Sequence, residues 1–347
     1  MSRVRRLLFA FLAAVLLAGG CFAAPEVPRD GPLTQRLEDF RAAHGLNERN
    51  FSFYFYDTVT GEKCCFNETA MMTAASTFKL PLNLYYYEME AAGEIAPDAW
   101  IPRAGTTLDV CHQRSIVDSN NEVSIGMLYN LGNFRTYKEK MRKYFTMTDE
   151  EISSAYYADN NYCTRMMGET LQYLYEHREQ FPEMLDYMKQ ACPGHYFKKY
   201  ISDVEIAHKY GSFDGAENDT GIFFTEQPFL LAVYTKGIGE DISARAALMC
   251  LTYNQEQIAE VKAAKAAADA ALQAWKQTAA QKAAVQEAPV QTVEVPEAPA
   301  PAAPAVVLTW WMIPLALAVF LLGSGIVLWL LRTVSKRKFA PKVKKDF

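Results

Sequence analysis

Strand-like runs stand at both ends of residues 35–255, and helical runs occupy the sequence between them. Residues 51–57 alternate aromatic and small side chains, a Thr-Gly turn follows, and the pattern resumes at 63–66, which predicts a β-hairpin. Similar patterns predict strands at 204–209, 221–224 and 229–235, and helices at 77–92, 125–131, 136–144 and 166–176. The expected fold is α/β (α+β): an antiparallel sheet built from the N- and C-terminal segments, flanked by helices, with an inserted all-α subdomain.

A hydroxyl and an amine three residues apart stand between the hairpin and the first of these helices. Ser76 and Lys79 form an S-x-x-K motif at the start of the predicted helix, where the helix dipole favours developing negative charge. A serine hydroxyl is a poor nucleophile at neutral pH, and a lysine whose charge is suppressed by burial can serve as its base. The motif predicts an enzyme that acylates its own serine, although a solvated serine and lysine on a helix surface also fit so short a pattern.

Two later motifs favour the catalytic interpretation over a solvated surface pair. An S-x-N motif runs from Ser119 to Asn121, and a K-x-G motif runs from Lys209 to Gly211. With the motifs S-x-x-K, S-x-N and K-x-G in this order, the chain resembles the class A β-lactamase-like serine hydrolases of the β-lactamase and penicillin-binding protein superfamily. The resemblance covers residues 35–255, and it implies the same plan of sheet and inserted helices with the active site in the cleft between them.

The resemblance assigns chemical roles to the first two motifs. Ser76 would be the nucleophile, and Lys79 would be its proton acceptor or relay. Ser119 would pass a proton to the leaving amine, and Asn121 would orient the substrate or Lys79. The alternative for the second motif is an ordinary polar turn. Position 120 is Asn where the lactamase pattern has Asp, so a charge is lost there.

The third motif would bind substrate. Lys209 would supply positive charge for a substrate carboxylate, and Gly211 would let the backbone approach the ligand. Ser212 would provide either an oxyanion-facing amide or a hydrogen bond to the carboxylate, and the oxyanion hole would also use the amide of Ser76. The alternative is an edge-strand lysine beside a turn glycine. Tyr210 stands where the family pattern has Thr.

No residue of this sequence clearly corresponds to the base that deacylates the acyl-enzyme in class A β-lactamases. Class A β-lactamases carry a glutamate in an E-x-x-L-N segment, and no such segment lies between Ser119 and Lys209. Glu150 and Glu151 are the nearest candidates, although acids of a first helical turn are the favoured interpretation of this pair. Without an efficient base the acyl-enzyme would accumulate.

Three functions follow. The leading hypothesis is a membrane-anchored serine hydrolase of the β-lactamase family, which acylates Ser76 with a β-lactam and hydrolyses the acyl-enzyme. The second is a D-Ala-D-Ala peptidase or penicillin-binding protein acting on peptidoglycan peptides. The third is a non-hydrolytic sensor of β-lactams or wall peptides, which the absence of a recognisable output domain in the short tail argues against. None of the three needs a cofactor.

The N-terminal end predicts export. Three arginines precede the apolar run 7–17, and small residues follow, so residues 1–24 are expected to be a signal peptide. Cys21 suits a lipoprotein cysteine, but cleavage by an ordinary signal peptidase near Ala23 or Ala24 fits equally well, and we lean slightly against lipidation.

The C-terminal end predicts a membrane anchor. Residues 256–305 comprise an Ala/Lys-rich helical stretch and a Pro/Ala-rich spacer. Residues 306–331 are apolar, exceed the roughly 20 residues that span a bilayer, and are expected to form a transmembrane helix. The basic residues of 332–347 would stay cytoplasmic. We therefore expect a single-pass protein of the bacterial cell membrane with an extracytoplasmic catalytic domain.

Composition excludes other classes of partner. The net charge is −5 although the tail is strongly basic, so the exported part is acidic and a nucleic-acid partner is not expected. The five histidines are scattered and no C-x-x-C spacing occurs, so no metal site is expected. The seven cysteines reveal no pairing, and buried free thiols are expected for several of them.

Overall fold

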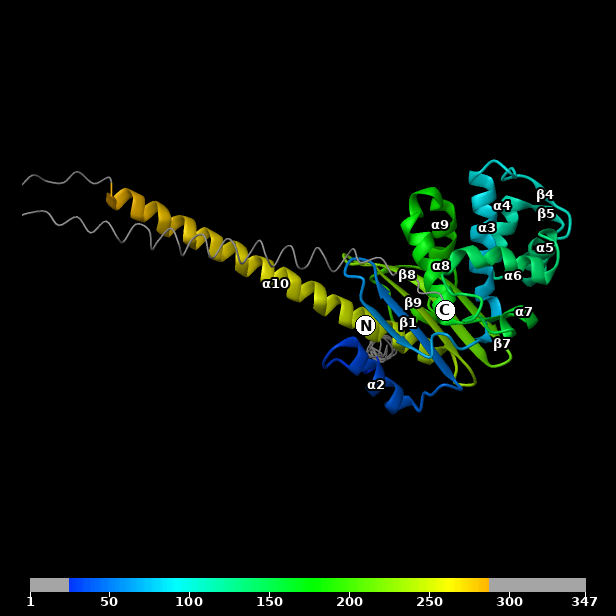
Figure 1. Cartoon of the computed structure of the whole chain (residues 1–347), viewed down its shortest axis with the longest axis horizontal. Helices are drawn as coiled ribbons and strands as arrows, with labels where there is room; N and C mark the ends of the chain where they lie inside the picture. The colour runs from blue at the N-terminus through cyan, green and yellow to red at the C-terminus, as the bar shows by residue number, and fades with distance from the viewer. Residues whose placement is uncertain (1–24, 287–347) are drawn as a thin grey trace, which may run out of the picture. The chain divides into compact units, whose positions relative to one another are not determined.

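A five-stranded antiparallel sheet joins the two ends of the catalytic region (Figure 1). The computed structural model describes residues 25–286. The strand order is β2-β1-β9-β8-β7, with bounds β1 Phe51–Asp57, β2 Lys63–Phe66, β7 Glu205–Phe213, β8 Ala216–Phe224 and β9 Phe229–Thr235. Because β1 pairs with β9 from Phe51↔Thr235 to Asp57↔Phe229, the sheet combines N- and C-terminal segments as the sequence predicts.

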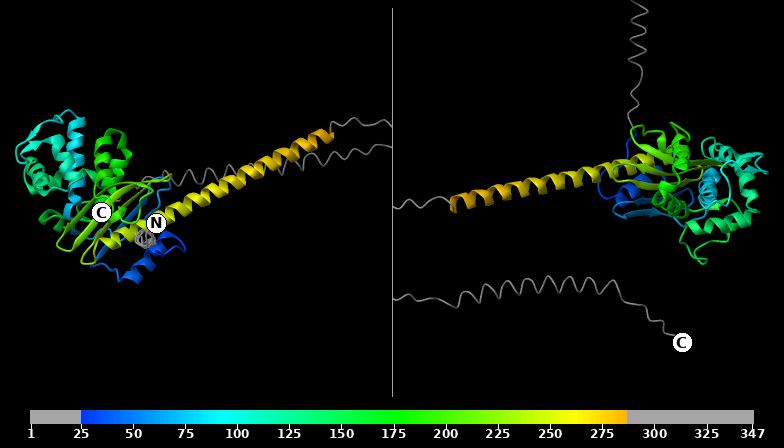
Figure 2. Two further views of the ribbon diagram at one scale, coloured as in Figure 1. Left: turned by 180° about the vertical axis from the view of Figure 1, so that it is seen from behind. Right: turned by 90° about the horizontal axis from the view of Figure 1, so that it is seen from above.

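Helices cover both faces of this sheet (Figures 1 and 2). Their bounds are α2 Leu33–His44, α3 Lys79–Ala91, α4 Leu108–Ile116, α5 Asn121–Asn130, α6 Phe134–Met141, α7 Ala155–Ala158, α8 Thr164–Glu176, α9 Pro182–Gln190 and α10 Glu240–Gln286. The short 3₁₀ helices are η1 Ala75–Phe78, η2 Arg142–Tyr144, η3 Arg178–Gln180 and η4 Tyr196–Lys198. Two further pairs of short strands lie outside the main sheet. In the first, β3 Met72–Thr73 pairs with β6 Asn161–Tyr162, and in the second, β4 Trp100–Ile101 pairs with β5 Thr106–Thr107. Helices α2 and α10 lie on one face, and the inserted helical region, α3 to α9, lies toward the other.

Strand β1 shows why both faces are buried. Successive side chains of a strand point to opposite faces. Phe51, Phe53 and Phe55 belong to the core shared with α2 and α10, whereas Tyr54 belongs to the core of the helical region. The aromatic run that predicts this strand therefore serves two cores, and the sheet separates them.

Helix α8 packs very closely on the sheet at Gly168. A Cβ atom built on Gly168 would lie 2.2 Å from two ring carbons of Tyr54. No real Cβ contact is that short, so the absence of a side chain at this position sets the distance between α8 and β1.

The sequence-based fold class was wrong in its membrane component. Within residues 25–286, no helix is both long and apolar enough to cross a bilayer. The longest helix there, α10, is rich in Ala, Lys, Gln and Glu, and its residues 261–282 are all exposed. The fold that the structure describes is thus α/β without a transmembrane helix.

Several predicted segments lie outside the described residues. They are the signal peptide at 1–24, the Pro/Ala-rich spacer from residue 287 onward, the apolar stretch at 306–331 and the basic tail at 332–347. The cysteines that the structure does describe are unpaired, and Cys64, Cys111, Cys163 and Cys250 among them are buried.

Gly168→Ala should destabilise the protein by about 1–3 kcal/mol, because the new methyl group overpacks the contact with Tyr54. The free energy of unfolding, measured by urea denaturation, tests this. Gln172→Ala is the matched control: it lies one turn further along α8, is only half-buried, and its side chain donates to the exposed Glu176, so it should change stability by less than about 0.5 kcal/mol. Equal stability of Gly168→Ala and wild type would contradict the close approach.

Candidate active site

Ser76 lies in the 3₁₀ turn η1, directly before α3. Ala75 has a φ of 50°, a left-handed conformation that costs about 1–3 kcal/mol unless its surroundings enforce it. Two contacts with the segment before β6 do so: the backbone N–H of Ala74 donates to Asn160 O at 2.8 Å, and Asn160 Nδ2 donates to Ala75 O at 2.8 Å. This turn carries the predicted nucleophile, and the name nucleophile turn is used for it below; it is fixed by a segment some 85 residues further along the chain.

Lys79 follows on the same turn, and its amine is buried within a polar cluster. Lys79 Nζ donates to Ser119 O at 2.5 Å and to Asn121 Oδ1 at 2.8 Å, and lies 3.2 Å from Ser119 Oγ. Burial lowers the pKa of Lys79 to about 7. In the neutral amine, two N–H groups suffice for Ser119 O and Asn121 Oδ1, which leaves the lone pair free to accept a proton.

Lys209 approaches the same serine from strand β7. Its side chain is fully buried, and Nζ donates to Ser119 Oγ and to Tyr210 O, both at 2.9 Å. Burial, and then the nearby Lys79, hold the pKa of Lys209 well below its usual value. Once Lys79 has accepted a proton, its third N–H can donate to Ser119 Oγ together with Lys209, which occupies the lone pairs of Ser119 Oγ and leaves the hydroxyl hydrogen to donate to a ligand. Ser119 itself has a φ of 53°.

Gly211 brings the sheet against the nucleophile. A Cβ atom on Gly211 would lie 2.5 Å from Ser76 N and 2.9 Å from Thr77 N, so only glycine allows this approach. Strand β7 is an edge strand, and the K-x-G motif places its edge directly beside the nucleophile turn.

Ser212 comes next on the strand, but its side chain is engaged elsewhere. Ser212 is exposed, and its Oγ donates to Glu217 Oε1 at 2.8 Å. Glu217 Oε2 accepts a second hydrogen bond from Tyr196 at 2.6 Å. The Ser212 hydroxyl is thus bound to the Glu217 carboxylate, whereas the backbone of Ser212 follows directly after Gly211 on the strand.

The structure does not bring Glu150 or Glu151 to this cluster. Glu151 accepts from Thr148 N at 2.8 Å and from Arg165 Nη1 at 3.1 Å, and these contacts lower the pKa of Glu151. Glu150 is exposed. In the described part of the chain, the hydrogen-bond partners of Lys79 and Lys209 include no carboxylate.

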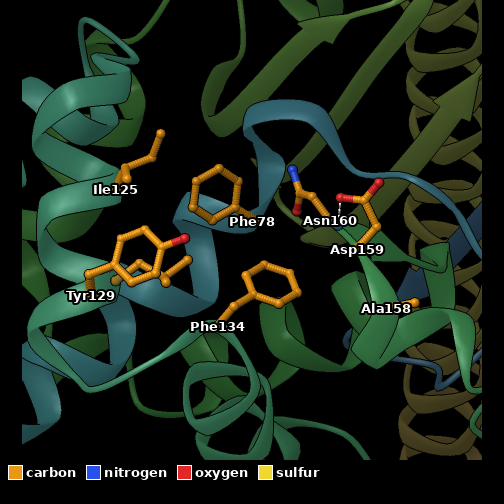
Figure 3. A pocket seen from close by; sticks show the side chains of 8 residues that line it. Phe78, Ile125, Tyr129, Phe134, Ala158, Asp159 and Asn160 are labelled. Atoms are coloured by element: carbon orange, nitrogen blue, oxygen red, sulfur yellow. Dashed lines mark hydrogen bonds between the residues drawn. The ribbon is translucent and has the colours of Figure 1, made fainter.

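A pocket of about 390 Å³ adjoins the nucleophile turn (Figure 3). Its walls are mostly apolar, and one end is polar; the lining residues are Phe78, Ile125, Leu128, Tyr129, Phe134, Ala158, Asp159 and Asn160. Neither this pocket nor the contacts of Asn160 could be predicted from the sequence, because the walls come from four separate elements whose proximity no local spacing reveals. The sequence signal nearest to them is the pair Asn160-Asn161, which resembles the end of the E-x-x-L-N loop of class A β-lactamases although the glutamate is absent.

Comparisons with known proteins confirm the family that the sequence resembles. The model of the beta-lactamase enzyme family matches residues 32–254. The structure resembles PBP-A, with a TM-score of 0.55, 15% identity and coverage of 67% of this chain and 99% of that one. It also resembles the class A β-lactamase of the last common ancestor of Gram-negative bacteria (TM-score 0.53, 17% identity, 64% and 98% coverage) and a β-lactamase from Sphaerobacter thermophilus (0.52, 19%, 62% and 94%). No curated protein matches the sequence.

NMR titration of the lysine side-chain resonances should give Lys79 a pKa of about 7, so that its amine is neutral at higher pH and charged at lower pH. The physical reason is desolvation, which disfavours the ammonium form. Lys79→Arg assigns the signal by its disappearance. A Lys79 pKa near the ordinary value of about 10.4 would contradict a buried, neutral amine.

Proposed function

The chain belongs to the beta-lactamase enzyme family, and from that premise we propose that it opens β-lactams by acylation of Ser76 and then hydrolyses the acyl-enzyme. The observation that carries the proposal is the buried cluster in which Lys79 and Lys209 share Ser119. It supplies a base of suitable pKa three residues after Ser76 in the chain, and a Ser119 hydroxyl that can protonate a leaving nitrogen.

Acylation would move one proton through this cluster. Lys79 takes the hydroxyl proton of Ser76 while Ser76 Oγ attacks the lactam carbonyl carbon. The carbon–nitrogen bond then breaks, and Ser119 gives its proton to the lactam nitrogen while it regains one from Lys79, 3.2 Å away. The backbone amides of Ser76 and Ser212 are the proposed oxyanion donors, since Gly211 packs directly against the first of them.

Hydrolysis of the acyl-enzyme would depend on Lys79 as well. No carboxylate among the described residues forms a hydrogen bond with Lys79 or Lys209, so the bases that the cluster offers to a water molecule are amines, and Lys79 is the one that follows Ser76 in the chain. We therefore expect acylation to be faster than deacylation.

The same observation favours a second candidate, a D-Ala-D-Ala peptidase or penicillin-binding protein that acts on peptidoglycan peptides. Ser119 would then protonate the leaving amine of a peptide rather than a lactam nitrogen. One of the similar structures is PBP-A, whose name is in keeping with this alternative. Either function would be carried out outside the cytoplasm if the predicted signal peptide is used.

A time course by intact mass separates the two candidates. The protein is mixed with benzylpenicillin, and loss of a chromogenic cephalosporin is followed by absorbance. A β-lactamase gives catalytic loss with a transient adduct, whereas a penicillin-binding enzyme gives a stable single adduct.

Ser76→Ala should abolish the adduct without a change in the thermal unfolding midpoint, because only the nucleophilic oxygen is removed. Persistent labelling of this variant would exclude Ser76 as the nucleophile, and an unlabelled wild type would contradict both candidates.

Gly211→Ala should lower the rate of acylation by about 100-fold, because the methyl group would displace the Ser76 turn by a distance that matters for attack. Measurement of the adduct by mass against time gives the rate. The thermal unfolding midpoint of the variant is measured alongside, so that a loss of fold is distinguished from a slower attack. Unaltered acylation by Gly211→Ala would contradict the role of this contact.

A further inference from the structure

A network of buried polar side chains, which the proposed mechanism does not use, crosses three helices that pack against one another (Figure 1). Its members are Asn83 from α3, His112 and Ser115 from α4, and Ser124 from α5. All four side chains are fully buried. Burial of a polar group is costly unless it finds a partner, so the contacts of this buried network show what it holds in place.

Asn83 lies one helical turn after Lys79 and fixes the direction of the hydrogen bonds. Its Nδ2 donates to the backbone carbonyl of Lys79 at 2.7 Å and to Ser115 Oγ at 2.8 Å. Because a carbonyl oxygen only accepts, the amide nitrogen of Asn83 must face it, and Oδ1 is the atom that meets His112 Nδ1 at 2.9 Å. His112 Nδ1 therefore carries a hydrogen and donates it to Asn83.

His112 anchors one end of the buried network. Its Nε2 lies 3.0 Å from Glu90 Oε1, and the ring of Tyr87 stacks on the imidazole with the centroids 3.8 Å apart. With a partner at each nitrogen and a ring against its face, the imidazole has one orientation. The hydrogen on Nδ1 thus stays directed at Asn83 and keeps the amide of Asn83 from turning over.

At the other end, the hydrogen bonds lead to the S-x-N motif. Ser124 Oγ donates to the backbone carbonyl of Asn120 at 2.6 Å, so Ser115 is the donor in the 2.8 Å contact between the two serines. Each member from Asn83 to Ser124 therefore donates to the next, and hydrogen bonds aligned in this way strengthen one another.

These contacts close a circuit through the active site. Lys79 Nζ donates to Ser119 O and to Asn121 Oδ1, on either side of Asn120 in the sequence. Asn83 binds the backbone carbonyl of the same lysine. Lys79 is thus held at both ends: its amine binds the S-x-N motif, and its backbone binds the network that also holds this motif.

We propose that the buried network positions the S-x-N motif against Lys79, with Asn83, Ser115 and Ser124 as the connecting residues and His112 as their anchor. Ser119 needs such support, because its φ of 53° persists only where surrounding contacts fix it. The four are positioning residues, since the described hydrogen-bond partners of Lys79 Nζ and Ser119 Oγ include none of them. The inference rests on the proposed acylation of Ser76 and adds residues outside the three motifs to those that determine its rate.

The experiment removes the two connecting hydroxyls singly and together. The second-order rate constant of acylation by benzylpenicillin is measured by intact mass for the full chain and for Ser115→Ala, Ser124→Ala and the double variant. Each single variant should acylate about 10- to 100-fold more slowly, the loss expected when a reacting group moves by about 1 Å. Because both hydroxyls belong to one path, the double variant should be no slower than the slower single variant, whereas independent effects would multiply.

NMR titration of Lys79 gives a second readout, which a purely structural role would not change. Movement of the S-x-N motif would admit water to the amine, so the pKa of Lys79 should rise toward its ordinary value in both single variants. Thermal unfolding midpoints are measured for all the proteins, and the rates are compared well below the lowest of them.

Thr170→Val is the matched control. Thr170 is buried in α8, and its Oγ1 donates to the carbonyl of Met166, four residues earlier, as Ser124 does to Asn120. The control thus removes a hydroxyl of the same kind outside the buried network, and it should leave the acylation rate and the pKa of Lys79 unchanged.

Four results would overturn the proposal: single variants that acylate at the wild-type rate, a double variant whose loss is the product of the two single losses, an unchanged pKa of Lys79, or equal slowing in Thr170→Val. A wild-type protein that benzylpenicillin does not label would instead overturn the proposed acylation. The Lys79 titration does not need acylation and would still test the network, so the two failures are distinguishable.

Discussion

The active-site region depends on two buried lysines that share one serine hydroxyl. Lys79 comes from helix α3, Lys209 from strand β7, and Ser119 from the turn before α5, so one oxygen joins the helical region to the sheet. Burial of an uncompensated ammonium is costly, and no carboxylate of the described residues forms a hydrogen bond with either amine; the more distant Asp219 offsets the cost for Lys209 only in part. The lower pKa values of both amines are the result, because the neutral form avoids that cost. Burial, which disfavours the charged form of the amine, thus produces a neutral amine that can accept a proton.

Close packing at Gly211 and hydrogen bonds to Asn160 hold this arrangement in place. Gly211 permits the sheet edge to meet the nucleophile turn, and the left-handed conformations of Ala75 and Ser119 aim the two serines. Such conformations persist only where surrounding contacts fix them. For the first turn those contacts come from Asn160, whose segment is held in turn by the pairing of β3 with β6. The geometry of the site therefore depends on the inserted helical region as much as on the sheet.

Local patterns predicted the sheet well and the surroundings of the site only in part. The aromatic alternation at 51–57 and the apolar run at 229–235 predict strands because burial on two faces leaves a direct mark on the sequence. The motif residues Lys79, Ser119, Asn121 and Lys209 could likewise be named in advance, and the structure brings them together. Glu151 could not be excluded from sequence, since its pairing with Arg165 involves residues in different elements. Asn160 and the pocket were missed for the same reason, because they exist only once distant segments meet.

The low sequence identity to the solved structures is compatible with this difference between the apolar core and the polar site. Apolar cores tolerate extensive substitution when volume and pattern are kept, whereas a buried polar cluster fails once a single partner is lost. A domain of this fold can therefore differ at most positions, as identities of 15–19% illustrate, without disturbance of the lysine–serine cluster. The pocket walls divide in the same way: Phe78 and Leu128 belong to the core, whereas Ile125, Tyr129 and Ala158 are exposed, contribute little to the core and can change with little effect on stability.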